Sequence, residues 1–152
     1  MKLERQFVGV ITPTAPFNFD ATIYKPAHFS SGDNFWELGV RWQTFRWANN
    51  NLGVIFRNAG TIEKPRVTLE IFSKEKLSGE FVNDFIKEII YRYNLNLDLT
   101  QFYKKFSKDK VLGPVINRIY GMRPGHQDSL YEYLIIGVVL QNCTVRRSIK
   151  MM

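Results

Sequence analysis

Alternating apolar and polar positions dominate the first 75 residues and predict a β-rich front part of the chain. In 17–25, for example, every odd position from 17 to 23 is apolar, which would place four side chains on one face of a strand. The polar stretch 48–51 separates two segments rich in aromatic and β-branched residues, as in a hairpin. We therefore expect four or five antiparallel strands, including 17–25, 35–47, 52–57 and 67–73.

After these segments the spacing of apolar residues changes to that of helices. Residues 80–93 repeat apolar side chains every three or four positions, which predicts an amphipathic helix covering one face of the sheet. Two shorter helices are expected at 98–109 and 111–121, with Pro114 in the first turn of the second and Gly121 at its end.

A more apolar helix is predicted at 129–142. Ser129 and Glu132 have the spacing of a capping box, and the residues beyond are apolar all round. We therefore expect this helix to be buried on every side. Because the other predicted helices give it little cover, we also expect the chain to be the front part of a longer protein.

The order of elements, strands first and helices afterwards, predicts an α+β fold. We expect an N-terminal antiparallel sheet domain with a covering helix over residues 1–97. Residues 98–152 would then begin a separate, all-α domain.

The charge is uneven along the chain. Residues 1–100 contain 12 Lys and Arg against 11 Asp and Glu, whereas residues 101–152 contain 9 against 3. The later part therefore carries almost all of the net charge of +7. This distribution indicates an anionic partner, most often nucleic acid, although a solvated basic surface without a partner would have the same composition.

Several classes of protein are excluded by the residues available. One cysteine, Cys143, permits no internal disulfide framework, and with only His28 and His126 besides it we assign no metal and no cofactor. The longest apolar run, 134–140, is too short to cross a bilayer, and the N-terminus has no signal-peptide pattern. We expect a cytoplasmic protein in a reducing environment, and its oligomeric state stays open, with dimers possible.

No catalytic residue is identified. The chain has no nucleophile–base pattern and no phosphate-binding glycine loop. Asp128 and Glu132 are better explained as helix-start residues than as catalysts.

The strongest candidate for binding is the corner QNCTVRR, residues 141–147. Gln141 and Asn142 end the apolar helix, Thr144 can cap the next helix, and Arg146 and Arg147 lie in the first turn of that helix. Backbone N–H groups and arginines at a helix start suit a phosphate, and the amides could reach base edges. An ordinary helix–helix corner with surface arginines is the alternative.

Three segments resemble one family. SLYEYLIIGVVLQNCTVRRSIKMM resembles the opening helices of the helix-hairpin-helix DNA glycosylases, and NLNLDLTQFYKKFSKDKVLGPVINRIYGMRP resembles the sequence that leads into them. WQTFRW at 42–47 is similar to the Gly-Gln-x-Phe-Arg-Trp box in the N-terminal domain of 8-oxoguanine DNA glycosylases. The overall likeness is greatest to the 3-methyladenine glycosylases of bacteria and archaea.

The resemblance implies a sheet domain similar to half of a TATA-binding protein, followed by the first helices of a helix-hairpin-helix domain. It implies base-excision repair, in which a damaged base is flipped out of double-stranded DNA and its N-glycosidic bond is cleaved. Gln141 and Asn142 would insert into the DNA at the lesion, and Arg146 and Arg147 would lie close to its backbone.

The same resemblance makes Trp42, Gln43 and Phe45 the edge of the lesion pocket. Trp42 stands where the oxidised-guanine enzymes have glycine, which favours alkylated purines over 8-oxoguanine. The family's catalytic residues would lie beyond residue 152, so we expect this chain alone to be inactive.

Two alternatives belong to other classes: a non-catalytic DNA-binding or scaffolding module, and a protein-interaction domain with an incidental basic face. The first predicts DNA binding without base release, and the second predicts no DNA binding even at low salt.

Overall fold

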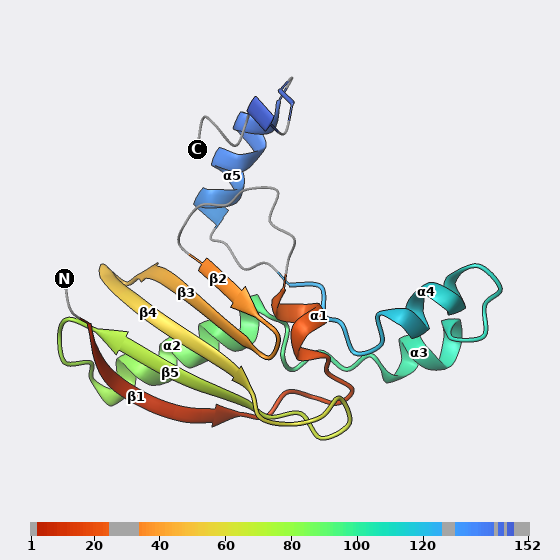
Figure 1. Ribbon diagram of the computed structural model, residues 1–152, viewed down its shortest axis with the longest axis horizontal. Helices are drawn as coiled ribbons and strands as arrows, with labels where there is room; N and C mark the ends of the chain where they lie inside the picture. The colour runs from red at the N-terminus through yellow and green to blue at the C-terminus, as the bar shows by residue number, and fades with distance from the viewer. Residues whose placement is uncertain (1–2, 25–33, 126–129, 142, 145, 148–152) are drawn as a thin grey trace.

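A five-stranded antiparallel sheet forms the body of the protein in the computed structural model, which describes residues 3–24, 34–125, 130–141, 143–144 and 146–147. Four strands follow one another as a meander, and the first strand pairs with the last at the edge, giving the order β1-β5-β4-β3-β2 (Figure 1). The strands are β1 Glu4–Ile11, β2 Asn34–Glu37, β3 Val40–Trp47, β4 Asn50–Asn58 and β5 Val67–Ser73.

The central strands agree with the hydrophobic pattern. In β5, residues 67, 69, 71 and 73 are buried and the residues between them are not, as the alternation predicts. The predicted hairpin is present between β3 and β4, where Trp47 pairs with Asn50. Ala48 and Asn49, which form its two-residue turn, both have positive φ, as a tight turn matching the strand twist requires.

The predicted single strand 35–47 was wrong, because it is two strands joined by a second hairpin. Leu38 and Gly39 form the turn, and Glu37 pairs with Val40. Gly39 has φ +78°, a conformation in which glycine is not strained, and its N–H donates a 2.7 Å hydrogen bond to Oδ1 of Asp20.

The predicted strand 17–25 was also wrong, since the structure forms helix α1 over Phe19–Ile23. Oδ1 of Asn18 accepts a hydrogen bond from the N–H of Ala21, which caps the helix. Phe19, Thr22 and Ile23 are its buried residues. Their three- and four-residue spacing fits a helix. In so short a segment, the apolar positions fit both the two-residue period of a strand and the period of a helix.

Edge strand β1 is a strand that no segment of the hydrophobic pattern had predicted. Seven of its eight residues are exposed or only half-buried, and Ile11 alone is buried. An edge strand of this kind buries too little of either face to show a clear alternation.

Helix α2, Gly79–Arg92, covers one face of the sheet as predicted (Figure 1). Oγ of Ser78 accepts a 3.1 Å hydrogen bond from the N–H of Phe81 and so caps the helix. Phe85 and Ile89 are completely buried against the sheet. The core between these layers contains Ile11, Phe17, Phe19, Ile23, Phe45, Leu52, Val54, Phe56, Val67, Leu69, Ile71, Val82, Phe85, Ile89, Tyr93 and Leu95.

The two short helices are present where they were expected. α3, Thr100–Phe106, and α4, Leu112–Arg118, form a helical hairpin beside the sheet (Figure 1). Pro114 lies in the first turn of α4, and Gly121, three residues beyond its end, has φ +82°.

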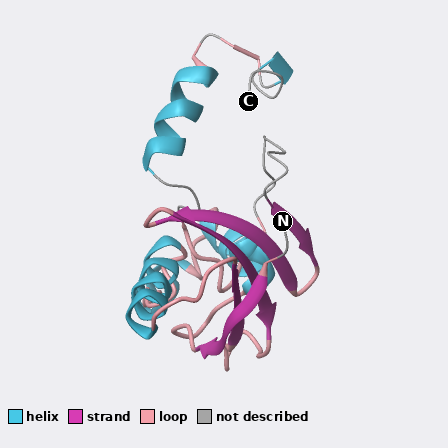
Figure 2. Cartoon of the chain, turned by 90° about the vertical axis from the view of Figure 1, so that its left-hand side faces the viewer, coloured by secondary structure: helices cyan, strands magenta, loops and turns pink. Residues whose placement is uncertain are grey.

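Helix α5, Leu130–Leu140, is not buried, contrary to the prediction. Leu130 and Val138, for example, are 75% and 67% exposed. Figures 1 and 2 both show α5 standing away from the sheet, so no described element covers it. Its all-round apolar composition predicted burial, but the described part of the chain offers no surface for it to pack on. Ser129 of the predicted capping box lies outside the described residues, and the side chain of Glu132 is not described.

Candidate functional site

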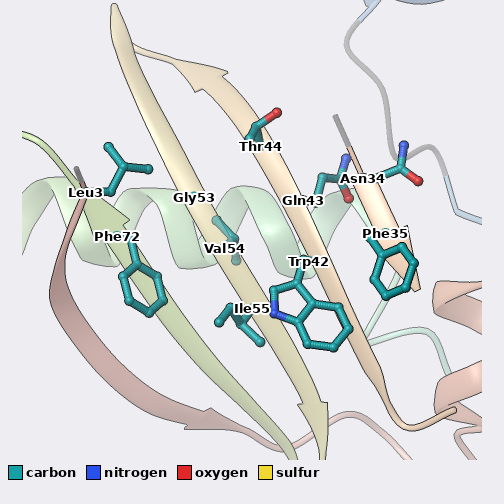
Figure 3. Close-up of a pocket in the computed structure, with 10 residues that line it drawn as sticks. All are labelled: Leu3, Asn34, Phe35, Trp42, Gln43, Thr44, Gly53, Val54, Ile55 and Phe72. Carbon is teal, nitrogen blue, oxygen red and sulfur yellow. The ribbon is translucent and has the colours of Figure 1, made fainter. Parts of the chain in front are cut away.

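The face of the sheet opposite α2 carries an open, largely apolar groove. Its volume is about 420 Å³, and Figure 3 shows its residues on β2 to β5, together with Leu3 just before β1, and α2 behind the sheet. The groove is lined by Leu3, Asn34, Phe35, Trp42, Gln43, Thr44, Gly53, Val54, Ile55 and Phe72.

The strand register places aromatic side chains along the groove and a glycine at its base. Phe35 and Trp42 are direct cross-strand partners, with their ring centroids 5.5 Å apart. Gly53, on β4, pairs with Phe72 of β5. A Cβ atom at Gly53 would lie 3.2 Å from Cδ1 of Leu3, so any side chain there would begin to fill the groove.

Only one of the three predicted pocket-edge residues presents its side chain to this groove. Trp42 lies on the open face, as Figure 3 shows. Gln43 borders the groove but is 7% exposed, and Phe45 packs in the core with its ring centroid 5.5 Å from that of Phe85. Successive residues of a strand point to opposite faces, so the structure does not bring the three side chains together.

Gln43 instead holds β3 from the core side. Its Oε1 accepts a 3.0 Å hydrogen bond from Nε of Arg41 and a 2.9 Å hydrogen bond from the hydroxyl of Tyr93. Nη1 of Arg41 also donates to the carbonyl oxygen of Ile23 at 2.6 Å. This buried network ties β3 to α1 and to the end of α2, and thereby fixes the strand on which Trp42 lies.

An ion-pair cluster occupies another part of the open face. Nε of Arg57 lies 2.9 Å from one carboxylate oxygen of Glu70, and Nη1 of Arg5 lies 3.5 Å from the other. The hydrogen bond from Arg57 is the main reason why the pKa of Glu70 lies below its ordinary value. The open face thus combines an apolar, aromatic groove with a charged region in which the carboxylate is paired.

The corner at 141–147 is accessible to solvent. Gln141, Thr144, Arg146 and Arg147 are all exposed, and Asn142 lies outside the described residues. Oγ1 of Thr144 accepts a 3.4 Å hydrogen bond from the N–H of Arg147, which is the bond that a helix cap makes. The structure does not bring this corner to the groove, because α5 carries it away from the sheet (Figures 1 and 2).

The segment 121–125, between α4 and α5, is hydrogen-bonded to the sheet unit. The carbonyl of Gly121 accepts a 2.8 Å hydrogen bond from the N–H of Asn18, and the N–H of Arg123 donates to Oγ1 of Thr22 at 3.1 Å. Nδ2 of Asn94 donates to the carbonyl of Pro124. The segment after α4 therefore returns to the sheet unit before α5 begins.

Arg41 and Arg123 are two buried arginines that sequence reasoning missed. They are 4% and 2% exposed, and burial lowers the pKa of Arg123 below its ordinary value. Nη2 of Arg123 donates to the carbonyl of Thr14, whereas its Nε and Nη1 have no hydrogen-bond partner among the described residues. Arg41 has the same parity in β3 as the buried Phe45, whereas the exposed Arg46 has the opposite parity, so the alternation was the one signal that could have found it.

Within the described ranges, no three His, Cys, Asp or Glu side chains are grouped as metal ligands. None of the described helices is long and apolar enough to span a bilayer.

The sheet, its single covering helix and the trailing short helices define an α+β domain with an aromatic groove on its uncovered face. Residues 39–134, well over half of the chain, match the family described as 8-oxoguanine DNA glycosylase, N-terminal domain. The chain belongs to this family, and the resemblance carried by the WQTFRW box and the helical lead-in is confirmed.

The fold is similar to that of the 3-methyladenine DNA glycosylase from Archaeoglobus fulgidus. The TM-score is 0.70 at 15% sequence identity, over 92% of this chain and 47% of that one. This chain therefore spans about half the length of that protein, and the α+β fold class is confirmed. No curated protein matches the sequence.

Proposed function

We propose that this chain is the N-terminal part of a DNA glycosylase that flips damaged bases out of double-stranded DNA and excises them. The membership in the glycosylase N-terminal domain family carries this proposal. The fold shared with a 3-methyladenine glycosylase and the excess of positive charge after residue 100 support it.

In this proposal the residues of this chain bind and position DNA and do not perform the chemistry. The reacting sugar carbon is shielded while a base is stacked, so the base must leave the duplex and the void must be filled. Gln141 and Asn142 fill that void, and Arg146 and Arg147 hold the neighbouring phosphates. The exposure of Gln141 and both arginines is consistent with this role. Catalytic groups come from sequence beyond residue 152, and this chain alone is inactive.

Alkylated purines are the proposed lesions. Alkylation of a purine ring nitrogen in a nucleoside gives a flat, cationic base, and cations are attracted to the faces of aromatic rings. Trp42 and its neighbour Phe35 offer such faces at the groove, whereas close backbone approach at position 42 is blocked by the indole. The groove therefore forms one wall of the lesion pocket, with Trp42 at its edge.

Duplex binding tests the DNA-contacting part of the proposal. We expect the chain to bind a labelled duplex at low salt, and the Arg146→Ala/Arg147→Ala variant to bind about ten-fold or more weakly, because two phosphate contacts are lost. Lys74→Ala/Lys76→Ala removes the same charge from exposed positions elsewhere and is the control. If the two variants bound the duplex with equal affinity, the proposed role of the 141–147 corner in DNA binding would be contradicted.

A non-catalytic DNA-binding module is the second candidate. The excess of positive charge after residue 100 suits it as well as the first candidate. It predicts duplex binding with little preference for damaged sites and no base release, even by the complete protein.

A further inference from the structure

The α3–α4 hairpin concentrates positive charge on the surface. Residues 100–120 contain five cations, Lys104, Lys105, Lys108, Lys110 and Arg118, against one anion, Asp109. All five cations are exposed, and none forms an ion pair with a described carboxylate. More than half of the net charge of the chain thus lies within 21 residues.

Four of these cations lie at one end of the hairpin. Lys104 and Lys105 are in the last turn of α3, and Lys108 and Lys110 are in the loop that leads to α4. Figure 1 shows this loop at the outer end of the helix pair, away from the sheet. We call these four lysines the basic tip.

The single anion, Asp109, offsets one of the four positive charges but, among the described residues, forms no ion pair with a lysine of the basic tip, because its carboxylate is bonded inside the turn. Oδ1 of Asp109 accepts 2.8 Å hydrogen bonds from the N–H groups of both Val111 and Leu112. These two bonds also lower the pKa of Asp109 below its ordinary value, so the group stays ionised and bound to the backbone.

The turn that carries the lysines has a defined shape. Gly113 lies so close to the preceding segment that a Cβ atom there would be 2.5 Å from the carbonyl oxygen of Ser107. Its N–H donates a 2.9 Å hydrogen bond to the carbonyl of Asp109. At the other end of the hairpin, the hydroxyl of Tyr103 accepts a 2.9 Å hydrogen bond from the N–H of Gly121 and so joins α3 to the returning segment.

We propose that the basic tip is a second DNA-contact surface, which binds phosphates of the duplex at a distance from the damaged base. Unpaired lysines on a protruding turn suit a row of phosphates, because each ammonium is a flexible point charge that needs no fixed geometry. Such contacts add affinity and orientation without reading sequence. The inference rests on the proposed function in taking duplex DNA as the partner.

Salt dependence of binding tests the basic tip separately from the 141–147 corner. The variant Lys104→Gln/Lys105→Gln/Lys108→Gln/Lys110→Gln is compared with Lys64→Gln/Lys74→Gln/Lys76→Gln/Lys87→Gln, which removes the same charge from exposed lysines elsewhere. The probe is an undamaged fluorescein-labelled duplex of about two helical turns, followed by anisotropy from about 50 to about 200 mM salt.

We expect the tip variant to reduce the slope of log K against log salt by about 2 to 4, since each phosphate contact contributes about 0.9. Over this four-fold range of salt the wild-type protein would then lose about 15- to 250-fold more affinity than the tip variant. The control variant should change the slope by less than about 1.

Equal slopes for the tip and control variants, with the Arg146→Ala/Arg147→Ala variant still impaired, would overturn this inference and leave the proposed function standing. The exposed apolar residues beside the tip, Val111 and Val115, would then favour a protein partner. Failure of the wild-type chain to bind any duplex at low salt would overturn the inference and the proposed DNA-binding role together.

Discussion

The hydroxyl of Tyr93 donates a 2.9 Å hydrogen bond to Oε1 of Gln43, which joins the end of α2 to the core side of β3. Both residues are buried, and the same oxygen also accepts from Nε of Arg41. This one acceptor therefore satisfies two buried donors, next to the residue that forms the wall of the groove.

Removing that acceptor should destabilise the protein. We expect Gln43→Leu to lower the free energy of unfolding by about 2 to 4 kcal/mol, because it removes an acceptor shared by a buried guanidinium N–H and a buried hydroxyl. Tyr93→Phe removes only one donor and should cost about 1 kcal/mol. Urea denaturation measures both, and equal losses for the two variants would contradict the shared role of Oε1.

Trp42, in the wall of the groove, should be important for release of the damaged base and should contribute little to the stability of the fold. In the complete protein, we expect Trp42→Ala to slow release of an alkylated purine by about 5- to 150-fold, the effect of one lost stacking surface. Trp42→Phe retains an aromatic face and should keep most of the activity. Thermal unfolding of both variants controls for damage to β3. If Trp42→Ala released the base at the wild-type rate, the groove would not be part of the lesion pocket.

Gly113 should be required for the shape of the α3–α4 hairpin. Gly113→Ala places a Cβ 2.5 Å from the carbonyl oxygen of Ser107, so the backbone must shift, and we expect a loss of about 1 to 3 kcal/mol in the free energy of unfolding. Gly79→Ala is the matched control, because a Cβ at Gly79 has no neighbour within 4 Å. Similar stabilities for the two variants would show that the close approach at Gly113 is not needed.

The Glu70 cluster should make stability depend on pH. The pKa of Glu70 is lowered in the folded state, chiefly by Arg57, so the pair stabilises the fold above the ordinary carboxyl pKa of 4.5. That contribution is lost as the pH falls through the lowered pKa. Because Arg57 is partly exposed, we expect Arg57→Gln to cost only about 0.5 to 1 kcal/mol at neutral pH.

At a pH below the lowered pKa of Glu70, the Arg57→Gln variant and the wild-type protein should be equally stable. Arg66→Gln, at an exposed position, should have little effect at either pH. A difference between Arg57→Gln and wild type that persisted unchanged in acid would rule out the ion pair as its cause.

Regular elements with a buried face were predictable from the sequence. The strand 67–73 and the helix around Phe85 each bury one face against the core, so their apolar residues recur with the period of the element. Segment 17–25 was not predictable in this way, because the apolar residues of a single helical turn can also fit the apolar–polar alternation of a strand. The exposure of α5 depends on which surfaces are available to cover it, and composition does not contain that information.

The candidate site was only partly predictable. The WQTFRW box lies within β3, but neighbouring residues of a strand face opposite sides, so Trp42 and Gln43 have different surroundings. The groove depends on Gly53 and Phe72, which come from other strands and meet Trp42 only through the sheet order. The positively charged composition after residue 100 was visible in the sequence, whereas the clustering of four lysines at one turn required the helical hairpin.

Base release by the complete protein tests the central claim most directly. The substrates are duplexes carrying 3-methyladenine, 8-oxoguanine or no lesion, with free base measured by chromatography, and the 152-residue chain is assayed in parallel. We predict release of 3-methyladenine by the complete protein, at least ten-fold slower release of 8-oxoguanine, and none by the chain alone. A complete protein that binds these duplexes but releases no base from any of them would contradict the glycosylase assignment and establish a non-catalytic DNA-binding module instead.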